Sequence, residues 1–432
     1  MQSYKLKQLE LGGRVVSEKL PSVRSISLGF WIGAGSRYEL PDESGVSHFI
    51  EHLLFKGGSR FDAVEIAQIF DGFGGELNAA TAREYTVVHA RFLDEHLDEA
   101  FEVMADMVLH PVFAEIDLER EVVVEEIAMY EDSPSELITD YLTQVLFDGH
   151  PLGKSVLGTT KIIGAVTPAQ IRGYHAGHYT LPNMVVAAAG NLEQERLVEL
   201  ARRHLAGGNG AAPQAAMIPA PPVAEKTKNA CFYQKDTQQY HVCFGGLGLS
   251  RHSERRFALS ILDGILGGSA SSRLFQEVRD KRGLAYSVYS FDALYSDTGL
   301  VGVYFGCRGD SVAEVTGIVA EQIEMIIADG VSEDELARAR ESAKGRVVLG
   351  METTHNRMSR LGKLTVTGSG ILSLDEIIER IDSVTADEVQ SLARDFYRPQ
   401  ELVAVGIGPD LKVFEQALET LGGRRELKVK AG

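Results

Sequence analysis

The segments "VTPAQIRGYHAGHYTLPNMVVAAAGN" (residues 166–191) and "VTADEVQSLARDFYRPQELVAVGIGP" (residues 384–409) are related by a constant offset of 218 residues, about half of the 432-residue chain. In each copy, a polar helix that begins after a threonine leads through a tyrosine into an apolar strand. The offset aligns three pairs of residues: Tyr179 with Tyr397, Val185 with Val403, and Gly190 with Gly408. A co-linear run at a fixed offset indicates an internal duplication.

The stretch between the two halves, "AGGNGAAPQAAMIPAPPVAEK" (residues 206–226), is rich in Gly, Ala and Pro. It has neither a helical nor a strand period, which is typical of a linker. We therefore predict an N-terminal domain at 1–206, a linker at 207–224 and a homologous C-terminal domain at 225–432. Domains of roughly 200 residues can bury a full core without disulfides.

Each half mixes strand-like and helical segments. The runs "SVRSISLGFWIGAG" (22–35) and "YTVVHARFL" (85–93) are typical of strands, whereas "LDEAFEVMADMVL" (97–109) and "SEDELARARESAKGRVVLGM" (332–351) are typical of helices. Because the strands cluster instead of alternating strictly with helices, we predict an α+β fold with a largely antiparallel sheet in each domain.

The composition narrows the class of partner. The chain carries 61 acidic and 43 basic residues, a formal charge of −18, which argues against nucleic acid as a partner. Two explanations of this net charge stay open. One is an acidic surface that aids solubility, and the other is an acidic cavity that attracts basic peptides. No run approaches the ~20 apolar residues of a membrane span, and the N-terminal segment has no leader pattern, so we expect a cytoplasmic protein without a membrane partner.

The segment "SHFIEHLLFKG" (residues 47–57) places two histidines and a glutamate within five positions of an apolar run. Asp42, Glu43 and Ser44 are suited to the start of a helix, and Lys56 and Gly57 to its end. We therefore predict a helix over residues 44–56.

His48, Glu51 and His52 fall on one face of this predicted helix. At about 100° per residue they share an arc of about a third of the circumference, and apolar residues occupy the remainder. A lone histidine in such a helix is usually a satisfied core residue. A pair at i, i+4 instead lets two imidazoles converge on one tetrahedral metal ion, and burying the trio without an ion would be costly. The pattern predicts a metal site that needs a third protein ligand.

The best source of that ligand is "DLEREVVVEEIAMYED" (residues 117–132). On a helical wheel Glu119 and Glu126 lie in the middle of an apolar arc formed by Leu118, Val122, Val123, Ile127, Met129 and Tyr130, whereas Glu125 lies at its edge. Carboxylates in a buried stripe need a cation or strong donors. We therefore predict that Glu126 binds the metal and that Glu119 orients a histidine ligand.

Glu51 is then beside the metal but not required as a ligand. A carboxylate in this position can act as a general base that takes a proton from an attacking water. The predicted reaction is therefore hydrolysis, most simply of an amide. The ligand types favour Zn²⁺, although manganese or cobalt also bind two imidazoles and a carboxylate.

The H-x-x-E-H pattern is the inverse of the common H-E-x-x-H zinc-protease motif. With Glu126 located 74 residues after His52 and with duplicated halves, the chain resembles the pitrilysin family of inverzincins, which includes insulin-degrading enzyme. It is most similar to the short two-domain branch typified by the mitochondrial processing peptidase and its bacterial relatives. The resemblance implies a zinc endopeptidase whose two homologous domains form a clam-like chamber for unfolded peptides.

Two further segments are similar to the family. "GGELNAATAREYT" (74–86) resembles an edge strand that pairs with the substrate backbone around Asn78 and Ala79, which would be β-augmentation. "SSRLFQEVRDKRGLAYSV" (271–288) resembles a segment whose Arg and Tyr reach the substrate, and these fall on Arg279 and Tyr286. Both side chains could donate to a substrate carbonyl or its oxyanion.

The helix of the second half that corresponds to the histidine helix, "RRFALSILDGIL" (255–266), contains no ligand pattern, so we expect one metal site in the first half. The resemblance also makes a homodimer with sites assembled across chains an expected arrangement. Two other functions stay open: a non-catalytic or partner-dependent assembly subunit, and a metal-dependent hydrolase of small molecules. The complete trio and Glu126 argue against the former, and the duplicated halves with a peptide-pairing strand argue against the latter.

Overall fold

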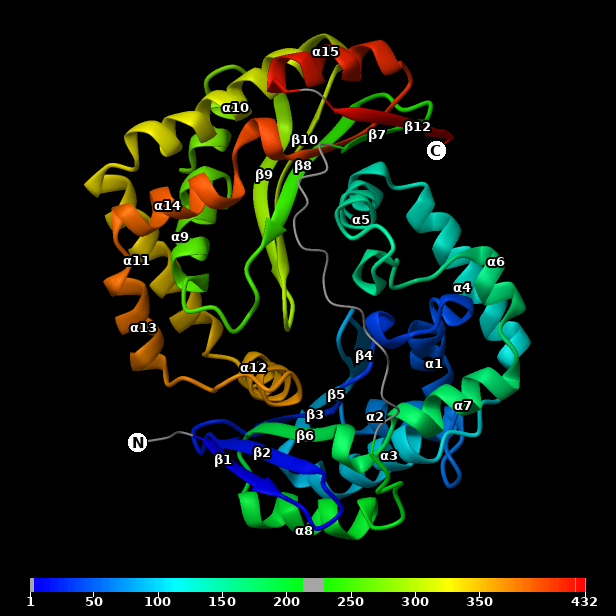
Figure 1. Cartoon of the computed structure of the whole chain (residues 1–432). Coiled ribbons are helices and arrows are strands. Elements are labelled where there is room, and N and C mark those ends of the chain that lie inside the picture. The colour runs from blue at the N-terminus through cyan, green and yellow to red at the C-terminus, as the bar shows by residue number, and fades with distance from the viewer. Residues whose placement is uncertain (1–3, 213–228, 424, 432) are drawn as a thin grey trace. The chain divides into compact units, whose positions relative to one another are not determined.

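Two six-stranded sheets, which share the arrangement of five strands and differ in the outer strand beside β2 or β7, organise the residues that the computed structural model describes, which are 4–212, 229–423 and 425–431 (Figure 1). The strand order is β1-β2-β6-β3-β5-β4 in one sheet and β12-β7-β11-β8-β10-β9 in the other. Most neighbours are antiparallel, while β2–β6, β7–β11 and β7–β12 are parallel. The predicted α+β class and the duplication are confirmed, although residues 213–224 of the predicted linker lie outside the described residues.

The strands have the following bounds: β1 Tyr4–Gln8, β2 Arg14–Lys19, β3 Ser25–Ile32, β4 Glu76–Thr81, β5 Thr86–Leu93, β6 Met184–Gly190, β7 Asn229–Gln234, β8 Tyr240–Gly248, β9 Ala285–Leu294, β10 Gly299–Cys307, β11 Val403–Gly408 and β12 Glu426–Ala431. The helices have the following bounds: α1 Val46–Leu54, α2 Ala63–Gly72, α3 Leu97–Leu109, α4 Ile116–Glu131, α5 Pro134–Leu146, α6 Thr160–Ala165, α7 Pro168–His178, α8 Gln194–Leu205, α9 Arg256–Leu266, α10 Val312–Asp329, α11 Glu333–Gly350, α12 Thr354–Val366, α13 Leu374–Ser383, α14 Ala386–Phe396 and α15 Leu411–Leu421.

The chain divides into two compact units, and each includes a segment from the other half of the sequence. The first unit contains the described residues up to 129, residues 154–212 and residues 348–373, and the second contains residues 130–153, 229–347 and 374–431. Helix α5 therefore belongs with the second sheet and α12 with the first. The predicted domain boundaries did not include this exchange of helices.

The repeated segment folds in the same way in both units. Thr167 accepts a hydrogen bond from the backbone of Gln170 at the start of α7, and Thr385 does the same with Glu388 at the start of α14, each within a capping box. Each helix ends at the aligned tyrosine and is followed by a short turn and a fully buried strand, β6 or β11.

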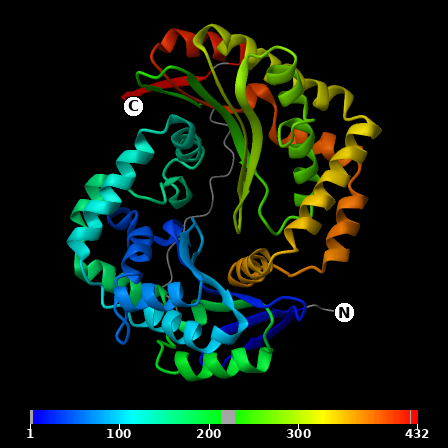
Figure 2. The same ribbon diagram turned by 180° about the vertical axis from the view of Figure 1, so that it is seen from behind.

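The first sheet is covered on both faces. One face packs against α1, α3 and α8 in the main core of the unit. The other packs against α12, where Met358 and Leu361 contact Trp31 and neighbouring strand residues. Both views show α12 lying along the sheet near β3 and β6 (Figures 1 and 2). Gly362 permits this approach, because a Cβ at that position would overlap the indole of Trp31.

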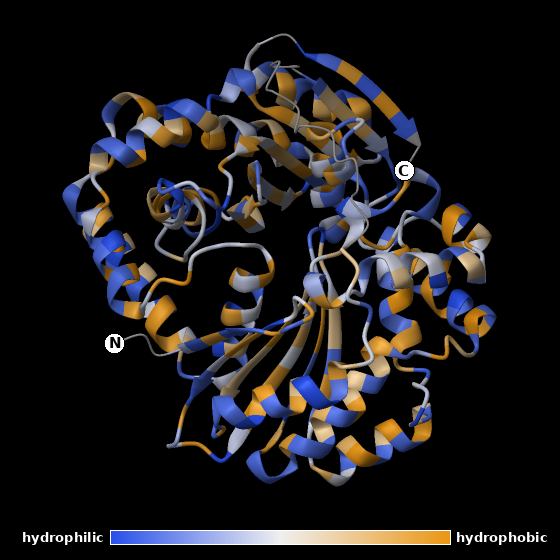
Figure 3. Ribbon diagram, turned by 60° about the horizontal axis from the view of Figure 1, so that its bottom comes forward, coloured by the Kyte–Doolittle hydropathy of each residue, from blue (hydrophilic) through white to orange (hydrophobic). Residues whose placement is uncertain are grey.

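The second sheet is covered by α5 in the equivalent way. Leu137, Ile138 and Leu142 of α5 pack against strand residues that include Cys231 and Cys243. These cysteines are buried and free, as is Cys307. At the edge of this sheet, β12 alternates polar and apolar residues, which Figure 3 shows as a striped arrow near the C-terminus. Among the described residues, no helix is long and apolar enough to cross a membrane.

Candidate metal centre

Helix α1 presents His48, Glu51 and His52 from one side of an otherwise apolar helix. Five of its apolar side chains are fully buried in the core: Val46, Phe49, Ile50, Leu53 and Leu54. The helix spans Val46–Leu54, so it is shorter at both ends than the predicted range of 44–56. Burial of these apolar residues explains why so short a helix is stable.

The predicted start of this helix was wrong in detail. Pro41–Glu43 form a 3₁₀ turn, and the N-cap residue is Gly45, whose φ of 93° favours glycine. No side chain of Asp42, Glu43 or Ser44 caps the helix. The capping acceptor is Glu39, which lies further back in the sequence and accepts hydrogen bonds from the N–H groups of Gly45 and Ser47.

The structure brings His48, His52 and Glu126 together. Nε2 of His48 lies 3.7 Å from Oε1 of Glu126, and Nε2 of His52 lies 3.3 Å from Oε2 of the same carboxylate. One potential ligand atom from each residue lies within 4.8 Å of the others, and this is the one such group found among the described residues. Two imidazoles and a carboxylate are a donor set that suits zinc and leaves a fourth position open.

Electrostatics favour a neutral imidazole at His48. Burial, and secondarily the nearby charge of His52, lowers the pKa of His48 to about 4. A neutral imidazole has a lone pair available for a metal. The side chain of His48 is 9% exposed, whereas that of Glu126 is 44% exposed, so the site is closed on one side and open on the other. The residues present therefore fit a catalytic metal.

Glu119 lies beside the ring of His52. Its Oε2 lies 3.3 Å from Nδ1 of His52, and its Oε1 lies 2.5 Å from Nζ of Lys56. The carboxylate is buried, and Lys56 supplies the positive charge that makes this burial tolerable. Sequence reasoning missed this role for Lys56, although its position four residues after His52 places it on the same side of the chain.

Glu51 is beside the cluster and is fixed by a residue that the sequence reasoning did not single out. Thr81 donates a hydrogen bond of 2.5 Å from Oγ1 to Oε2 of Glu51. Burial raises the pKa of Glu51, and the Thr81 hydrogen bond partly opposes this shift. Thr81 lies within the segment that resembles the family strand, so its position could have been noted from the sequence.

The predicted burial of α4 was partly wrong. Glu119, Val123 and Ile127 are buried, whereas three apolar residues of the predicted arc are exposed: Leu118 at 57%, Val122 at 46% and Met129 at 69%. The helix therefore packs through a narrower stripe than the wheel predicted. Glu126 lies at the border of this stripe, where a carboxylate can face both the histidines and the surroundings.

Asn78 and Ala79 lie on β4, which is an edge strand of the first sheet. Its side chains alternate between exposed and partly buried, and its partner on the inner side is β5. The N–H of Ala79 donates to Oδ1 of Asn78 at 2.8 Å, which indicates that this N–H points to the free edge. The edge can therefore accept another strand.

Arg279 and Tyr286 lie together in the second unit. Cζ of Arg279 is 4.3 Å from the ring centroid of Tyr286, and Tyr286 is 76% exposed. Both residues line a pocket of about 580 Å³ together with residues of α9, the following loop, the π-helix Phe275–Asp280 and β9, among them Asp263, Phe275, Tyr289 and Asp292.

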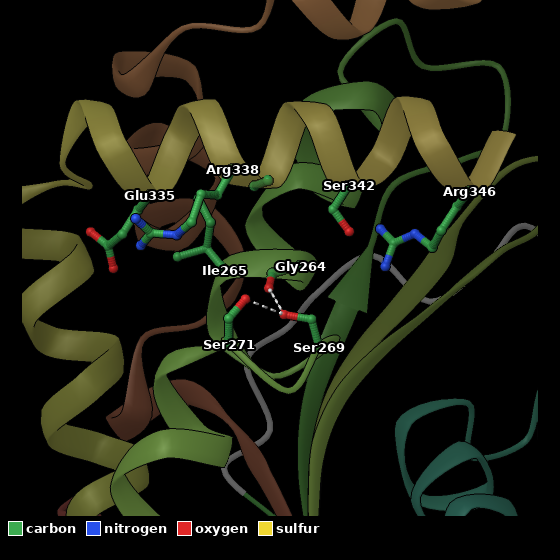
Figure 4. Close-up of a pocket in the computed structure, with 9 residues that line it drawn as sticks. Gly264, Ile265, Ser269, Ser271, Glu335, Arg338, Ser342 and Arg346 are labelled. Atoms are coloured by element: carbon green, nitrogen blue, oxygen red, sulfur yellow. Dashed lines mark hydrogen bonds between the residues drawn. The ribbon is translucent and has the colours of Figure 1, made fainter. Parts of the chain in front are cut away.

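A second pocket in this unit lies between the end of α9, the loop that follows it and α11 (Figure 4). Ser269 donates a hydrogen bond to the carbonyl of Gly264, and its Oγ lies 3.3 Å from Oγ of Ser271. The volume of about 30 Å³ corresponds to about one water molecule, too little for a peptide side chain.

Comparisons with known proteins agree in both halves of the chain. Residues 14–160 match the family described as insulinase (peptidase family M16), and residues 165–343 match the family described as peptidase M16 inactive domain. An uncharacterized zinc protease of Streptomyces coelicolor is 41% identical over 92% of this chain and 88% of its own length. The uncharacterized zinc protease YmxG of Bacillus subtilis is 38% identical over 91% of this chain and 96% of its own length.

Solved structures share the fold. The peptidase M16 inactive domain from Pseudomonas fluorescens superposes with a TM-score of 0.87 at 22% identity and covers 94% of this chain and 98% of its own. A protease from Helicobacter pylori gives a TM-score of 0.87 at 21% identity, with coverage of 94% and 99%. At these identities the likeness supports the fold.

Proposed function

Because this chain belongs to peptidase family M16, we propose that it is a zinc-dependent endopeptidase that hydrolyses unfolded peptides or short protein segments. The observation that carries the proposal is the convergence of His48, His52 and Glu126, with Glu51 adjacent to them. The names of the relatives support zinc as the metal.

His48, His52 and Glu126 would hold the metal, and Glu119 would orient the ring of His52 through Nδ1. When bound there, a zinc ion would supply a Lewis acid to polarise the scissile carbonyl and to lower the pKa of the attacking water. Glu51 accepts the proton of that water and returns it to the leaving amine. The raised pKa of Glu51 suits the first step, because a carboxylate with a higher proton affinity is a stronger base.

The free edge of β4 would hold the substrate as an added strand. Main-chain hydrogen bonds give affinity with little dependence on side chains, which suits a peptidase of unfolded segments. Thr81 ends this strand and contacts Glu51, so a peptide on β4 would extend toward the general base. The net charge of −18 is compatible with basic peptides as substrates.

Arg279 and Tyr286 would donate hydrogen bonds to the substrate carbonyl. We also propose a homodimer in which these two residues of one chain act at the metal site of the other chain. The test mixes Glu51→Gln and Tyr286→Phe subunits, each of which we expect to be inactive as a pure protein. Recovery of activity after mixing is expected if the base and the tyrosine of one site come from different chains. Persistent inactivity of a verified mixed dimer would place both residues in one chain.

The main test measures metal content and cleavage of a quenched basic peptide before and after chelation. We expect one zinc per chain, loss of cleavage with the chelator and recovery when zinc is added. A chain without metal would contradict the proposal. Stoichiometric zinc without cleavage of any unfolded peptide would instead favour the non-catalytic assembly subunit.

A further inference from the structure

Glu39 is a buried carboxylate that lies outside the metal site and faces the start of α1. The residue is 4% exposed and follows the 3₁₀ turn Ser36–Tyr38. Its Oε2 accepts a hydrogen bond of 2.8 Å from the N–H of Gly45, and its Oε1 accepts one of 2.9 Å from the N–H of Ser47. Both oxygens of the carboxylate therefore accept hydrogen bonds from the backbone at the start of α1.

These two hydrogen bonds replace the cap that α1 lacks. The first N–H groups of a helix have no partners within the helix, and a side chain at the N-cap usually satisfies one of them. Gly45 has no side chain, so the acceptor comes from six residues earlier.

The backbone of Glu39 and the side chain of Ser47 are also held by neighbouring side chains. Nζ of Lys154 donates a hydrogen bond of 2.8 Å to the backbone carbonyl of Glu39. The N–H of Ser47 binds Glu39, and its Oγ lies 2.8 Å from the hydroxyl oxygen of Tyr174 on α7. The first turn of α1 is thus fixed on two sides, directly before His48.

We propose that Glu39 is a positioning residue for the metal centre. By binding the N–H groups of Gly45 and Ser47, its carboxylate fixes the rotation of the first turn of α1 and so directs His48 and His52 toward Glu126. The helix has only nine residues, and His48 directly follows Ser47. A displacement of the first turn would therefore also displace the His48 side chain. This inference rests on the metal site proposed above.

The test compares zinc affinity in the intact chain, measured by competition with a chromophoric chelator, for the wild type and Glu39→Gln. The glutamine keeps the size of the side chain but places an amide N–H₂ opposite one backbone N–H. We expect zinc affinity to fall at least about tenfold, as it does when residues that orient metal ligands are removed. The visible spectrum of the Co²⁺-substituted protein should change as well, because the ligand geometry changes.

Asp62→Ala is the matched control. Asp62 caps α2 through the N–H of Glu65, and that helix carries no proposed ligand. This variant should lose a cap and some thermal stability yet bind zinc like the wild type. If Glu39→Gln also binds zinc with wild-type affinity and an unchanged Co²⁺ spectrum, the inference is wrong while the proposed function stands. If the wild type itself binds no zinc, the proposed function fails first.

Discussion

Thr81, the last residue of the edge strand β4, donates a hydrogen bond to Glu51 at the centre of α1. This contact joins the strand that would hold a peptide to the carboxylate that would activate water. The two residues are thirty positions apart in the sequence and belong to the same compact unit. In the proposed mechanism, substrate placement and proton transfer would therefore be connected through the side chain of Thr81.

Replacing Thr81 with valine should lower kcat more than it changes KM. A hydrogen bond to a charged group is worth about 1.5–3 kcal/mol, and its loss would leave Glu51 free to rotate away from the attacking water. We expect kcat to fall about tenfold or more, with zinc content unchanged. Steady-state kinetics and metal analysis on the same preparation check this; equal kcat in the two proteins would contradict the role of Thr81.

Glu51→Gln and Glu126→Gln should fail in different ways. Glu51→Gln removes the base and leaves the three ligands, so we expect full zinc content with no detectable hydrolysis. Glu126→Gln removes an anionic ligand, so zinc should be lost during dialysis against a weak chelator. Loss of zinc from Glu51→Gln would show that the roles of the two glutamates are assigned wrongly.

Ala79→Pro should impair peptide binding while preserving the sheet. Proline removes the N–H that points to the free edge, and edge strands tolerate proline at such positions. We expect KM for peptides to rise and zinc content and thermal stability to stay close to the wild type. Asn78→Ala is the control, because it frees the same N–H from the Asn78 side chain, and its KM should equal or fall below that of the wild type.

The sequence predicted the local features of the site better than its long-range ones. Helical periodicity placed the candidates His48, Glu51 and His52 on one face of a helix. It placed Glu119 and Glu126 on one face of another, because residues at helical spacing point in the same direction. The long-range contacts of Glu39, Lys56 and Thr81 depend on how the chain folds back on itself, which spacing alone does not specify.

The exchange of α5 and α12 between the units was missed for a similar reason. Helix α5 lies in the first half of the sequence but covers the second sheet, and α12 lies in the second half but covers the first. The apolar face of each is typical of any amphipathic helix, so it does not indicate which sheet the helix covers. The wheel for α4 failed because it assumed that every apolar residue was buried, whereas Leu118, Val122 and Met129 are exposed.

Gly362→Ala should destabilise the first unit. The added methyl would overlap the indole of Trp31, and overpacking of a core typically costs about 1–3 kcal/mol. Gly345→Ala in α11 is the matched control, since a Cβ there meets no other atoms and alanine favours a helix by about 0.5–1 kcal/mol. In urea unfolding, the change in unfolding free energy relative to the wild type should be opposite in sign for the two variants. If Gly362→Ala is as stable as the wild type, the close packing of α12 is refuted.

Glu335 should make stability depend on pH in the acid range. Burial alone would raise its pKa, but hydrogen bonds from Arg273 and Ser332 dominate and lower the pKa of Glu335 to about 2, from an ordinary value of 4.5. Because the unfolded chain binds this proton more readily than the folded chain, the stabilisation is complete above pH 4.5 and is lost as the pH falls toward 2.

The measurement for Glu335 is the difference in unfolding free energy between the wild type and Glu335→Gln across that range. We expect about 1 kcal/mol above pH 4.5, a modest value because the pair is partly exposed, and a decline toward zero in acid. Arg273→Gln should remove most of this pH dependence, since Arg273 donates two of the hydrogen bonds, at 2.7 and 2.9 Å. A difference that stays constant from neutral pH to pH 2 would show that the ion pair does not contribute to stability.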